Sequence, residues 1–228
     1  MIHHQVSVNG VSYHLLDNAQ VDRPLVLLHG FTGSTDTWSD QMARFAASQY
    51  AMRSQRIMAI DLLGHGKTES PDDPARYAIE AAAADLIALF DHLKYPEVDL
   101  LGYSMGGRLA LFTALTYPDR IARLLLESAS PGIADAAERT ERLRADQALA
   151  DRIEREGLPA FVDYWENLPL FAAQKRLPAE VQAQVRAGRL ANNPKGLANS
   201  LRGMGTGAQP SLWENLSALA LTRSADRG

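Results

Sequence analysis

A serine stands at the centre of a Gly-x-Ser-x-Gly motif that runs from Gly102 to Gly106. An apolar run at 98–101 precedes the motif, and a helix-forming segment at 108–116 follows it. A serine at such a sharp strand-to-helix turn presents its hydroxyl at the end of a sheet, and the small residues beside it let strand and helix approach. Ser104 is therefore a candidate nucleophile or base. The alternative is a glycine-rich turn with an incidental serine.

A second turn could supply the donors that an oxyanion beside Ser104 needs. The apolar run Leu25–Leu28 ends in His29-Gly30-Phe31. The spacing predicts that the backbone N–H of Phe31 lies beside that of Met105, at the start of the helix after the serine. These two N–H groups would form an oxyanion hole. The alternative is a simple strand-ending turn.

A serine hydroxyl needs a base, usually a histidine oriented by a carboxylate. In the chain order serine, acid, histidine that is typical after such a turn, both partners follow the nucleophile. The last histidine of the sequence is His92, so none follows Ser104. Glu127, after an apolar run, is either the acid or a carboxylate at the edge of the core. The sequence therefore has no recognisable base.

Arg108 follows the serine by four residues. On one helix this spacing places both side chains on the same face, one turn apart. A guanidinium there can bind a substrate carboxylate through two hydrogen bonds. A surface salt bridge is the alternative.

The elements that must position these residues alternate along the chain. Asn9-Gly10 between two short β-branched runs predicts an antiparallel hairpin at the N-terminus. Strands and helices then alternate over 25–126, which predicts a mostly parallel α/β sheet with helices on both faces. From Ile133 no strand is expected for about seventy residues, and prolines divide polar helices. We expect a core at 1–132, a helical cap at 133–203 and a return to the core at 204–228.

Bulk composition limits the function classes. The net charge of −4 and the pI of about 5.9 give no sign of a nucleic-acid partner. Cysteine is absent, which excludes disulfides and thiolate metal sites. No apolar run is long enough for a membrane span, and the N-terminus lacks a targeting pattern. We expect a cytoplasmic protein without a metal that acts on a small molecule.

The motifs together resemble the α/β-hydrolase superfamily and, more narrowly, the synthases that make 2-succinyl-6-hydroxy-2,4-cyclohexadiene-1-carboxylate in menaquinone biosynthesis. The arginine after the serine turn and the Met-Gly-Thr-Gly stretch are fairly specific to that synthase family. The resemblance covers nearly the whole chain, and its strongest stretches are Leu28–Gly33, Asp61–Gly66, Gly102–Arg108, Leu126–Gly132, Ala137–Arg139 and Gly203–Trp213.

The resemblance implies a lyase that eliminates pyruvate from a polycarboxylate substrate without a cofactor. It implies that a histidine activates Ser104, which removes a proton next to a carbonyl, while the oxyanion hole holds the developing charge. Carried over by motif, the residues are Ser104 as the catalytic residue, Phe31 and Met105 as oxyanion donors, and Tyr103, Arg108, Arg142, Trp165 and Arg189 as substrate contacts.

The chain departs from the family at its end. The family has two further strands after Leu212–Leu216, and these carry the triad aspartate and histidine; here 223–228 does not resemble them. We therefore expect a sheet without its last two strands and an impaired lyase. Two alternatives stay open: a small-ester serine hydrolase, and a non-catalytic protein that binds anions in the retained pocket.

Overall fold

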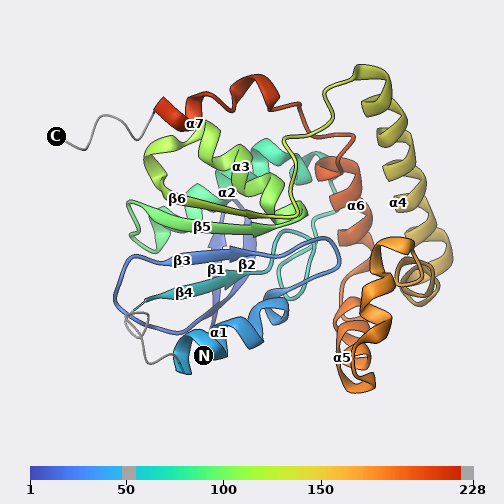
Figure 1. The fold of residues 1–228 in the computed structure, drawn as a ribbon, viewed down its shortest axis with the longest axis horizontal. Helices are drawn as coiled ribbons and strands as arrows, with labels where there is room; N and C mark the ends of the chain where they lie inside the picture. The colour runs from blue at the N-terminus through green and yellow to red at the C-terminus, as the bar shows by residue number, and fades with distance from the viewer. Residues whose placement is uncertain (48–54, 222–228) are drawn as a thin grey trace.

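A mixed sheet of six strands forms the centre of the molecule in the computed structural model, which describes residues 1–47 and 55–221 (Figure 1). The strand order is β1-β2-β4-β3-β5-β6. The only antiparallel pairs in the described sheet are β1 with β2 and β2 with β4. The strands span β1 Ile2–Val8, β2 Val11–Asp17, β3 Leu25–Leu28, β4 Ile57–Ile60, β5 Val98–Tyr103 and β6 Ile121–Glu127.

The predicted hairpin is confirmed, with Val8 opposite Val11 and two residues between them. Both turn residues have positive φ, 49° at Asn9 and 76° at Gly10. This is the backbone of a two-residue turn that matches the right-handed twist of paired strands, and Asn-Gly adopts it readily.

The fully buried strands β3 and β4 separate two layers of helix. Alternate residues of a strand point to opposite faces of the sheet. On one face, Val26 and Leu28 pack with side chains from helices α2 (Ile79–His92) and α3 (Met105–Thr116). On the other, Leu25 and Leu27 pack with the 3₁₀ helix Thr35–Trp38 and helix α1 (Ser39–Ala47). The continuous apolar runs therefore reflect a sheet covered on both faces, as the sequence predicted.

A buried carboxylate ties together the loops at the carboxyl ends of β3 and β4. Asp61 accepts hydrogen bonds from the backbone N–H groups of Thr35 at 2.5 Å and Lys67 at 2.9 Å. Its Oδ2 also lies 2.7 Å from Nδ1 of the buried His14 on β2. These contacts satisfy the carboxylate and fix the loop that carries Phe31.

The helical segment expected after Ile133 lies beyond the carboxyl ends of the parallel strands (Figure 1). Helix α4 kinks at Gly157, whose φ of 80° is not helical, and the proline-bounded breaks predicted from sequence separate the elements that follow. Helices α4 and α6 bury their own apolar cluster, which includes Ile153, Phe161 and Leu197. The elements are α4 (Ala136–Trp165), a 3₁₀ helix (Pro169–Arg176), α5 (Ala179–Leu190) and α6 (Pro194–Met204).

Hydrogen bonds join this helical segment to the loops of the sheet. Asn192, between α5 and α6, donates from Nδ2 to the carbonyl oxygen of Thr32 at 3.0 Å, and its Oδ1 accepts from the N–H of Gly66 at 3.0 Å. The helices are thus anchored above the strand ends where the candidate residues cluster. The division at 132 and 203 into core and cap stays a prediction.

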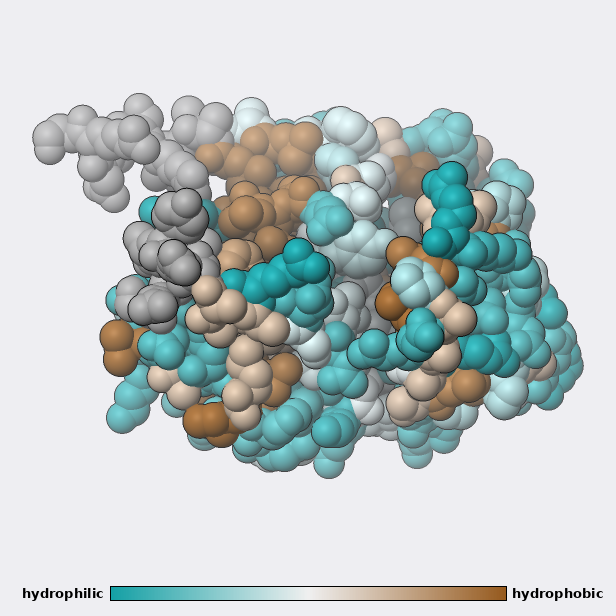
Figure 2. Space-filling model, turned by 60° about the horizontal axis from the view of Figure 1, so that its bottom comes forward, coloured by the Kyte–Doolittle hydropathy of each residue, from teal (hydrophilic) through white to brown (hydrophobic). Residues whose placement is uncertain are grey.

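Strand β6 forms an edge of the described sheet and exposes apolar side chains, with Leu125 45% and Leu126 43% exposed. Figure 2 shows apolar residues gathered toward the upper left of its face, whereas the right side is mainly hydrophilic. The last described elements are a 3₁₀ turn at Trp213–Asn215 and helix α7 (Ala218–Leu221). Within the described ranges, we find no helix long and apolar enough to cross a membrane.

Candidate active site

Ser104 sits between β5 and α3 in a strained backbone conformation, with φ 53° and ψ −112°. Its N–H donates to the carbonyl oxygen of Glu127 at 2.8 Å. The flanking glycines are required, because a Cβ on Gly102 would collide with the Gly106 backbone, and one on Gly106 would collide with the Leu28 and His29 backbone. The motif therefore forms the sharp strand-to-helix turn that its spacing predicted.

The loop after β3 lies directly beside this turn. The N–H of Gly106 donates to the carbonyl oxygen of His29 at 3.1 Å, and a Cβ on Gly30 would lie 3.3 Å from the Cβ of Ser104. The N–H groups of Phe31 and Met105 donate to no acceptor among residues 1–47 and 55–221. Both candidate oxyanion donors are thus unused, one on the loop after β3 and the other at the first residue of α3.

Two buried histidines lie close to the loop, and neither is bonded to Ser104. Both nitrogens of His29 are engaged, Nδ1 with the Gly30 carbonyl at 2.8 Å and Nε2 with the N–H of Leu62 at 3.0 Å. His65 uses Nδ1 on the Leu63 carbonyl at 3.0 Å, and its buried Nε2 has no partner among the described residues. Burial, with the nearby His29, lowers the pKa of His65 to about 3.

No histidine of the described part of the chain hydrogen-bonds Ser104. The side chain of Glu127, considered above as an acid, is exposed at the end of the edge strand β6. What Glu127 gives the serine turn is its backbone carbonyl.

Arg108 points its guanidinium toward the segment after α6. Its Nη1 donates to the carbonyl oxygen of Met204 at 3.0 Å and to Oε1 of Gln209 at 2.8 Å. No carboxylate of the described chain lies within 4 Å of it, and Nε and Nη2 donate to no described residue. Burial lowers the pKa of Arg108 to about 10, so the side chain remains cationic at neutral pH.

Arg142, on α4, is held by a carboxylate. Its Nε lies 2.8 Å from Oδ1 of Asp146, one helical turn away, and the arginine side chain is 49% exposed. The other Asp146 oxygen accepts the N–H of Gly207 at 3.0 Å. Asp146 therefore neutralises Arg142 while it fixes the Met-Gly-Thr-Gly stretch against α4.

Arg189, on α5, lines a cleft of about 620 Å³ between the loop after β3 and the helices above it. Its side chain is buried, its Nη2 donates to Oε1 of Gln174 at 2.8 Å, and the guanidinium lies 4.9 Å from the ring centre of Phe171. Phe31 and Tyr103 line the same cleft. Burial lowers the pKa of Arg189, and Glu166 and Tyr103 act in the opposite direction.

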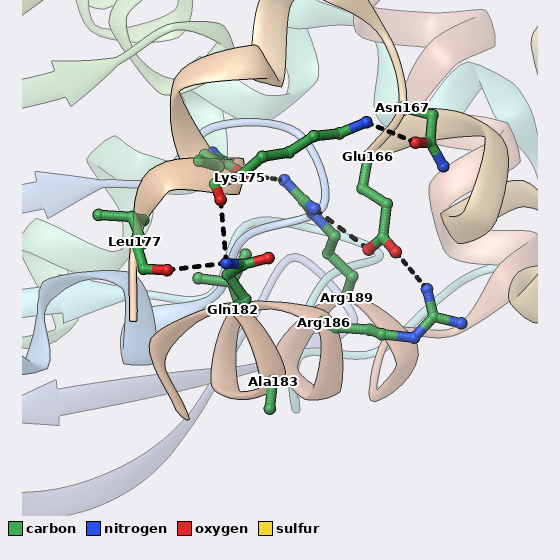
Figure 3. Close-up of a pocket in the computed structure, with 10 residues that line it drawn as sticks. Glu166, Asn167, Lys175, Leu177, Gln182, Ala183, Arg186 and Arg189 are labelled. Atoms are coloured by element: carbon green, nitrogen blue, oxygen red, sulfur yellow. Dashed lines mark hydrogen bonds and ion pairs between the residues drawn. The ribbon is translucent and has the colours of Figure 1, made fainter. Parts of the chain in front are cut away.

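A smaller pocket of about 200 Å³ lies behind Arg189, between α5 and the 3₁₀ helix (Figure 3). There Glu166 places Oε1 2.5 Å from Nη1 of Arg186 and Oε2 3.6 Å from Nη1 of Arg189. Lys175 donates to the amide oxygen of Asn167 at 2.7 Å. Glu166 therefore bonds Arg186 closely and Arg189 only at longer range.

Trp165, the last residue of α4, lies among three aromatic rings. Its ring centre lies 5.4 Å from those of Phe31 and Phe171 and 5.5 Å from that of Phe161. The indole Nε1 is buried without a hydrogen-bond partner among the described residues. An unpaired buried donor is unfavourable, and a ligand acceptor would relieve it.

The structure thus brings most of the predicted residues to one end of the sheet. Phe31, Tyr103 and Arg189 share the cleft, and Trp165 packs on Phe31. Arg108 and Arg142 belong to a neighbouring cluster around Asp146 and the 204–209 segment. The substrate and oxyanion roles of these residues stay predictions. No group of three possible metal ligands occurs within the described residues.

Two glutamines and a phenylalanine that were not among the predicted residues contact the arginines. Gln174 and Phe171 hold Arg189, and Gln209 holds Arg108. Gln209 lies inside the Gly203–Trp213 stretch quoted above, which was a usable signal. The polar segment around Gln174 offered none.

Comparisons with known proteins agree with this geometry. The family model described as alpha/beta hydrolase fold matches residues 23–223. A Bacillus subtilis (strain 168) protein provisionally named 2-succinyl-6-hydroxy-2,4-cyclohexadiene-1-carboxylate synthase is 47% identical over 214 residues, which are 92% of this chain and 75% of that protein. The synthase of the same name from Salmonella agona (strain SL483) is 34% identical over 197 residues, 86% of this chain and 73% of the relative.

Among solved structures, MenH from S. aureus superposes with a TM-score of 0.82 at 36% identity, covering 91% of this chain and 76% of that one. The two proteins therefore share their fold along most of this chain. The protein belongs to the α/β-hydrolase family and, within it, to the family of 2-succinyl-6-hydroxy-2,4-cyclohexadiene-1-carboxylate synthases.

Proposed function

We propose that this protein is a lyase of menaquinone biosynthesis that eliminates pyruvate from a cyclohexene polycarboxylate and releases 2-succinyl-6-hydroxy-2,4-cyclohexadiene-1-carboxylate. The relatives that carry this name support the assignment. No cofactor takes part, because a general base and fixed donors suffice for an elimination next to a carbonyl.

The observation that carries the proposal is the state of two arginines. Arg108 has no carboxylate within 4 Å in the described chain, and Arg189 is buried against a neutral amide with its nearest carboxylate oxygen at 3.6 Å. A cation removed from water without a close counterion is unfavourable, and an anionic ligand stabilises it. Arg189 on the cleft and Arg108 on the helix that follows Ser104 suit a substrate with several carboxylates.

Ser104 acts at the reacting carbon in this proposal. After its own proton has passed to a base, the Ser104 oxygen takes a proton from the carbon next to the substrate carbonyl, and the electron pair moves onto that carbonyl oxygen. The N–H groups of Phe31 and Met105 stabilise the oxyanion. The electrons then return to form a ring double bond and break the C–O bond to the leaving group, which departs as an enolate and takes up a proton to give pyruvate. Tyr103, Arg142, Trp165 and the two arginines above hold the substrate.

The step needs an acceptor for the serine proton. His29 has both nitrogens engaged, and the pKa of His65 is about 3, so neither suits a base at neutral pH. We therefore propose that Ser104 turns over slowly when no base takes its proton, because a coupled serine site without its base is slower by several orders of magnitude.

The test is release of pyruvate by purified protein from the synthase substrate, followed with a coupled NADH-dependent reductase. We expect a slow release that Ser104→Ala abolishes. Release that Ser104→Ala leaves unchanged would refute the role of the serine. Serine-dependent cleavage of a p-nitrophenyl ester without pyruvate release would favour the small-ester hydrolase instead, and ligand binding without either reaction would favour the anion-binding protein.

A further inference from the structure

The arginines near the site fall into two pairs that differ in their partners. We call Arg142 and Arg186 the outer pair and Arg108 and Arg189 the inner pair. The outer pair is 49% and 36% exposed, and each member has a close carboxylate, Asp146 at 2.8 Å and Glu166 at 2.5 Å. The side-chain hydrogen-bond acceptor of each inner arginine is a glutamine oxygen at 2.8 Å.

The acids near the inner pair make their closest contacts with the outer pair. Asp146 raises the pKa of Arg108 only through space, since its oxygens bond Arg142 and the Gly207 N–H. Glu166 places one oxygen 2.5 Å from Nη1 of Arg186 and the other in a longer ion pair, at 3.6 Å, with Nη1 of Arg189. Figure 3 shows both contacts of this carboxylate. The carboxylates therefore hold the outer pair more closely than the inner pair, whose nearest side-chain acceptors are the two amide oxygens.

A glutamine oxygen can orient a guanidinium without removing its charge. The amide accepts one N–H and fixes the plane of the group, whereas a carboxylate would also cancel the positive charge and compete with an anionic ligand. Gln209 is fully buried, and its Nε2 has no partner among the described residues. It thus holds Arg108 and keeps a spare neutral donor beside it.

Gln174 does the same from the cleft wall. It lines the 620 Å³ cleft together with Arg189 and also borders the smaller pocket behind it. The ring of Phe171 lies beside the guanidinium of Arg189, and the amide of Gln174 accepts its hydrogen bond. Together they fix the guanidinium in a largely dehydrated position. In such a position the charge interacts strongly with a ligand carboxylate.

We propose that Gln174 and Gln209 are specificity-determining positioning residues: they orient Arg189 and Arg108 while they preserve the charges that select a polycarboxylate over a monocarboxylate. The inference rests on the proposed function only for the choice of ligand class. It concerns binding and not turnover, so it can be tested in protein without catalytic activity.

The test compares glutamate variants at these positions. Gln174→Glu and Gln209→Glu keep the size of the side chain and its acceptor oxygen and add a negative charge on the arginine. The matched control is Gln184→Glu, since Gln184 is exposed, lines the same cleft and has no side-chain bond to an arginine in the described structure. Near-ultraviolet circular dichroism verifies folding, and if the fully buried Gln209→Glu misfolds, Gln174→Glu carries the test.

Calorimetric titration with tricarballylate and with butyrate gives the readout. We expect wild type to bind tricarballylate more tightly than butyrate. Gln174→Glu and Gln209→Glu should each bind tricarballylate about ten-fold or more weakly than wild type, and their affinity for butyrate should change little. Gln184→Glu should change tricarballylate affinity by less than about fivefold, as for an exposed charge.

Three results would overturn the inference. The first is a failure of wild type to bind tricarballylate, and the second is a folded Gln174→Glu or Gln209→Glu protein that keeps the wild-type affinity for it. An affinity loss in Gln184→Glu equal to that in the other two variants would be the third. Pyruvate release is measured separately. Binding that depends on the glutamines without any lyase activity would retain this inference and refute the proposed function.

Discussion

The backbone N–H of Gly106 donates to the carbonyl oxygen of His29 at 3.1 Å, which joins the turn after β5 to the turn after β3. This bond places the serine turn and the loop of Phe31 in one rigid arrangement. It exists because residue 106 has no side chain, since a Cβ there would lie 2.5 Å from the carbonyl oxygens of Leu28 and His29.

Gly106→Ala should therefore destabilise the protein by about 2 to 4 kcal/mol, because the added methyl forces two strand ends apart. Urea unfolding monitored by circular dichroism measures this change. Gly188→Ala is the matched control: a Cβ at Gly188 meets nothing within 4 Å, and helix propensity predicts a gain of up to about 1 kcal/mol. Equal stability of wild type and Gly106→Ala would contradict the contact.

Ser104→Gly should stabilise the fold and abolish chemistry. Glycine adopts a φ of 53° without the strain that serine carries, so the free energy of unfolding should rise by about 1 kcal/mol. Without the hydroxyl, pyruvate release should fall below detection. Ser211→Gly, at a position without positive φ, should instead be neutral or destabilising. A destabilised Ser104→Gly protein would show that the turn is unstrained.

The low pKa of His65 predicts a loss of stability in acid. Between pH 6.5 and about 3 the unfolded chain binds a proton at this histidine and the folded chain does not, so stability falls as the pH decreases through this window. From pH 7 to pH 5, His65→Asn should lose about 2 kcal/mol less than wild type. Urea midpoints at the two pH values test this, with the exposed His92→Asn as control. Parallel curves for wild type and His65→Asn would disprove it.

Arg108→Met should lower kcat/KM for an anionic substrate. Removing a charged donor that faces a carboxylate lowers kcat/KM by about 100-fold, while hydrolysis of a neutral ester should stay unchanged. Steady-state kinetics of pyruvate release provides the measurement. Arg44→Met, an exposed arginine paired with Asp40, serves as the control. A similar loss with both substrates would indicate general damage to the site.

Much of the fold followed from the sequence because its signals are local. Asn9-Gly10 fixed the hairpin, and the continuous run Leu25–Leu28 matched a strand buried on both faces. The place of Ser104 and Phe31 at one end of the sheet also followed, since parallel strands bring their carboxyl ends together.

The partners of the arginines could not be predicted in the same way. Arg108 meets Gln209 across 101 residues, and Arg189 meets Gln174 from a different element. Such pairs depend on how packed elements orient long side chains, and no periodic pattern encodes that. Spacing alone also failed to show that Arg142 is bound by Asp146, although the two are four residues apart on one helix.

The central position of β3 has a consequence for synthesis. β3 pairs with β4 on one side and with β5 on the other, and roughly forty residues separate the end of β4 from the start of β5. A ribosome that adds about 5 to 20 residues per second needs several seconds to supply them. During that interval the nascent chain holds four of the six strands with one side of β3 unpaired, so chaperone protection should matter most before β5 emerges.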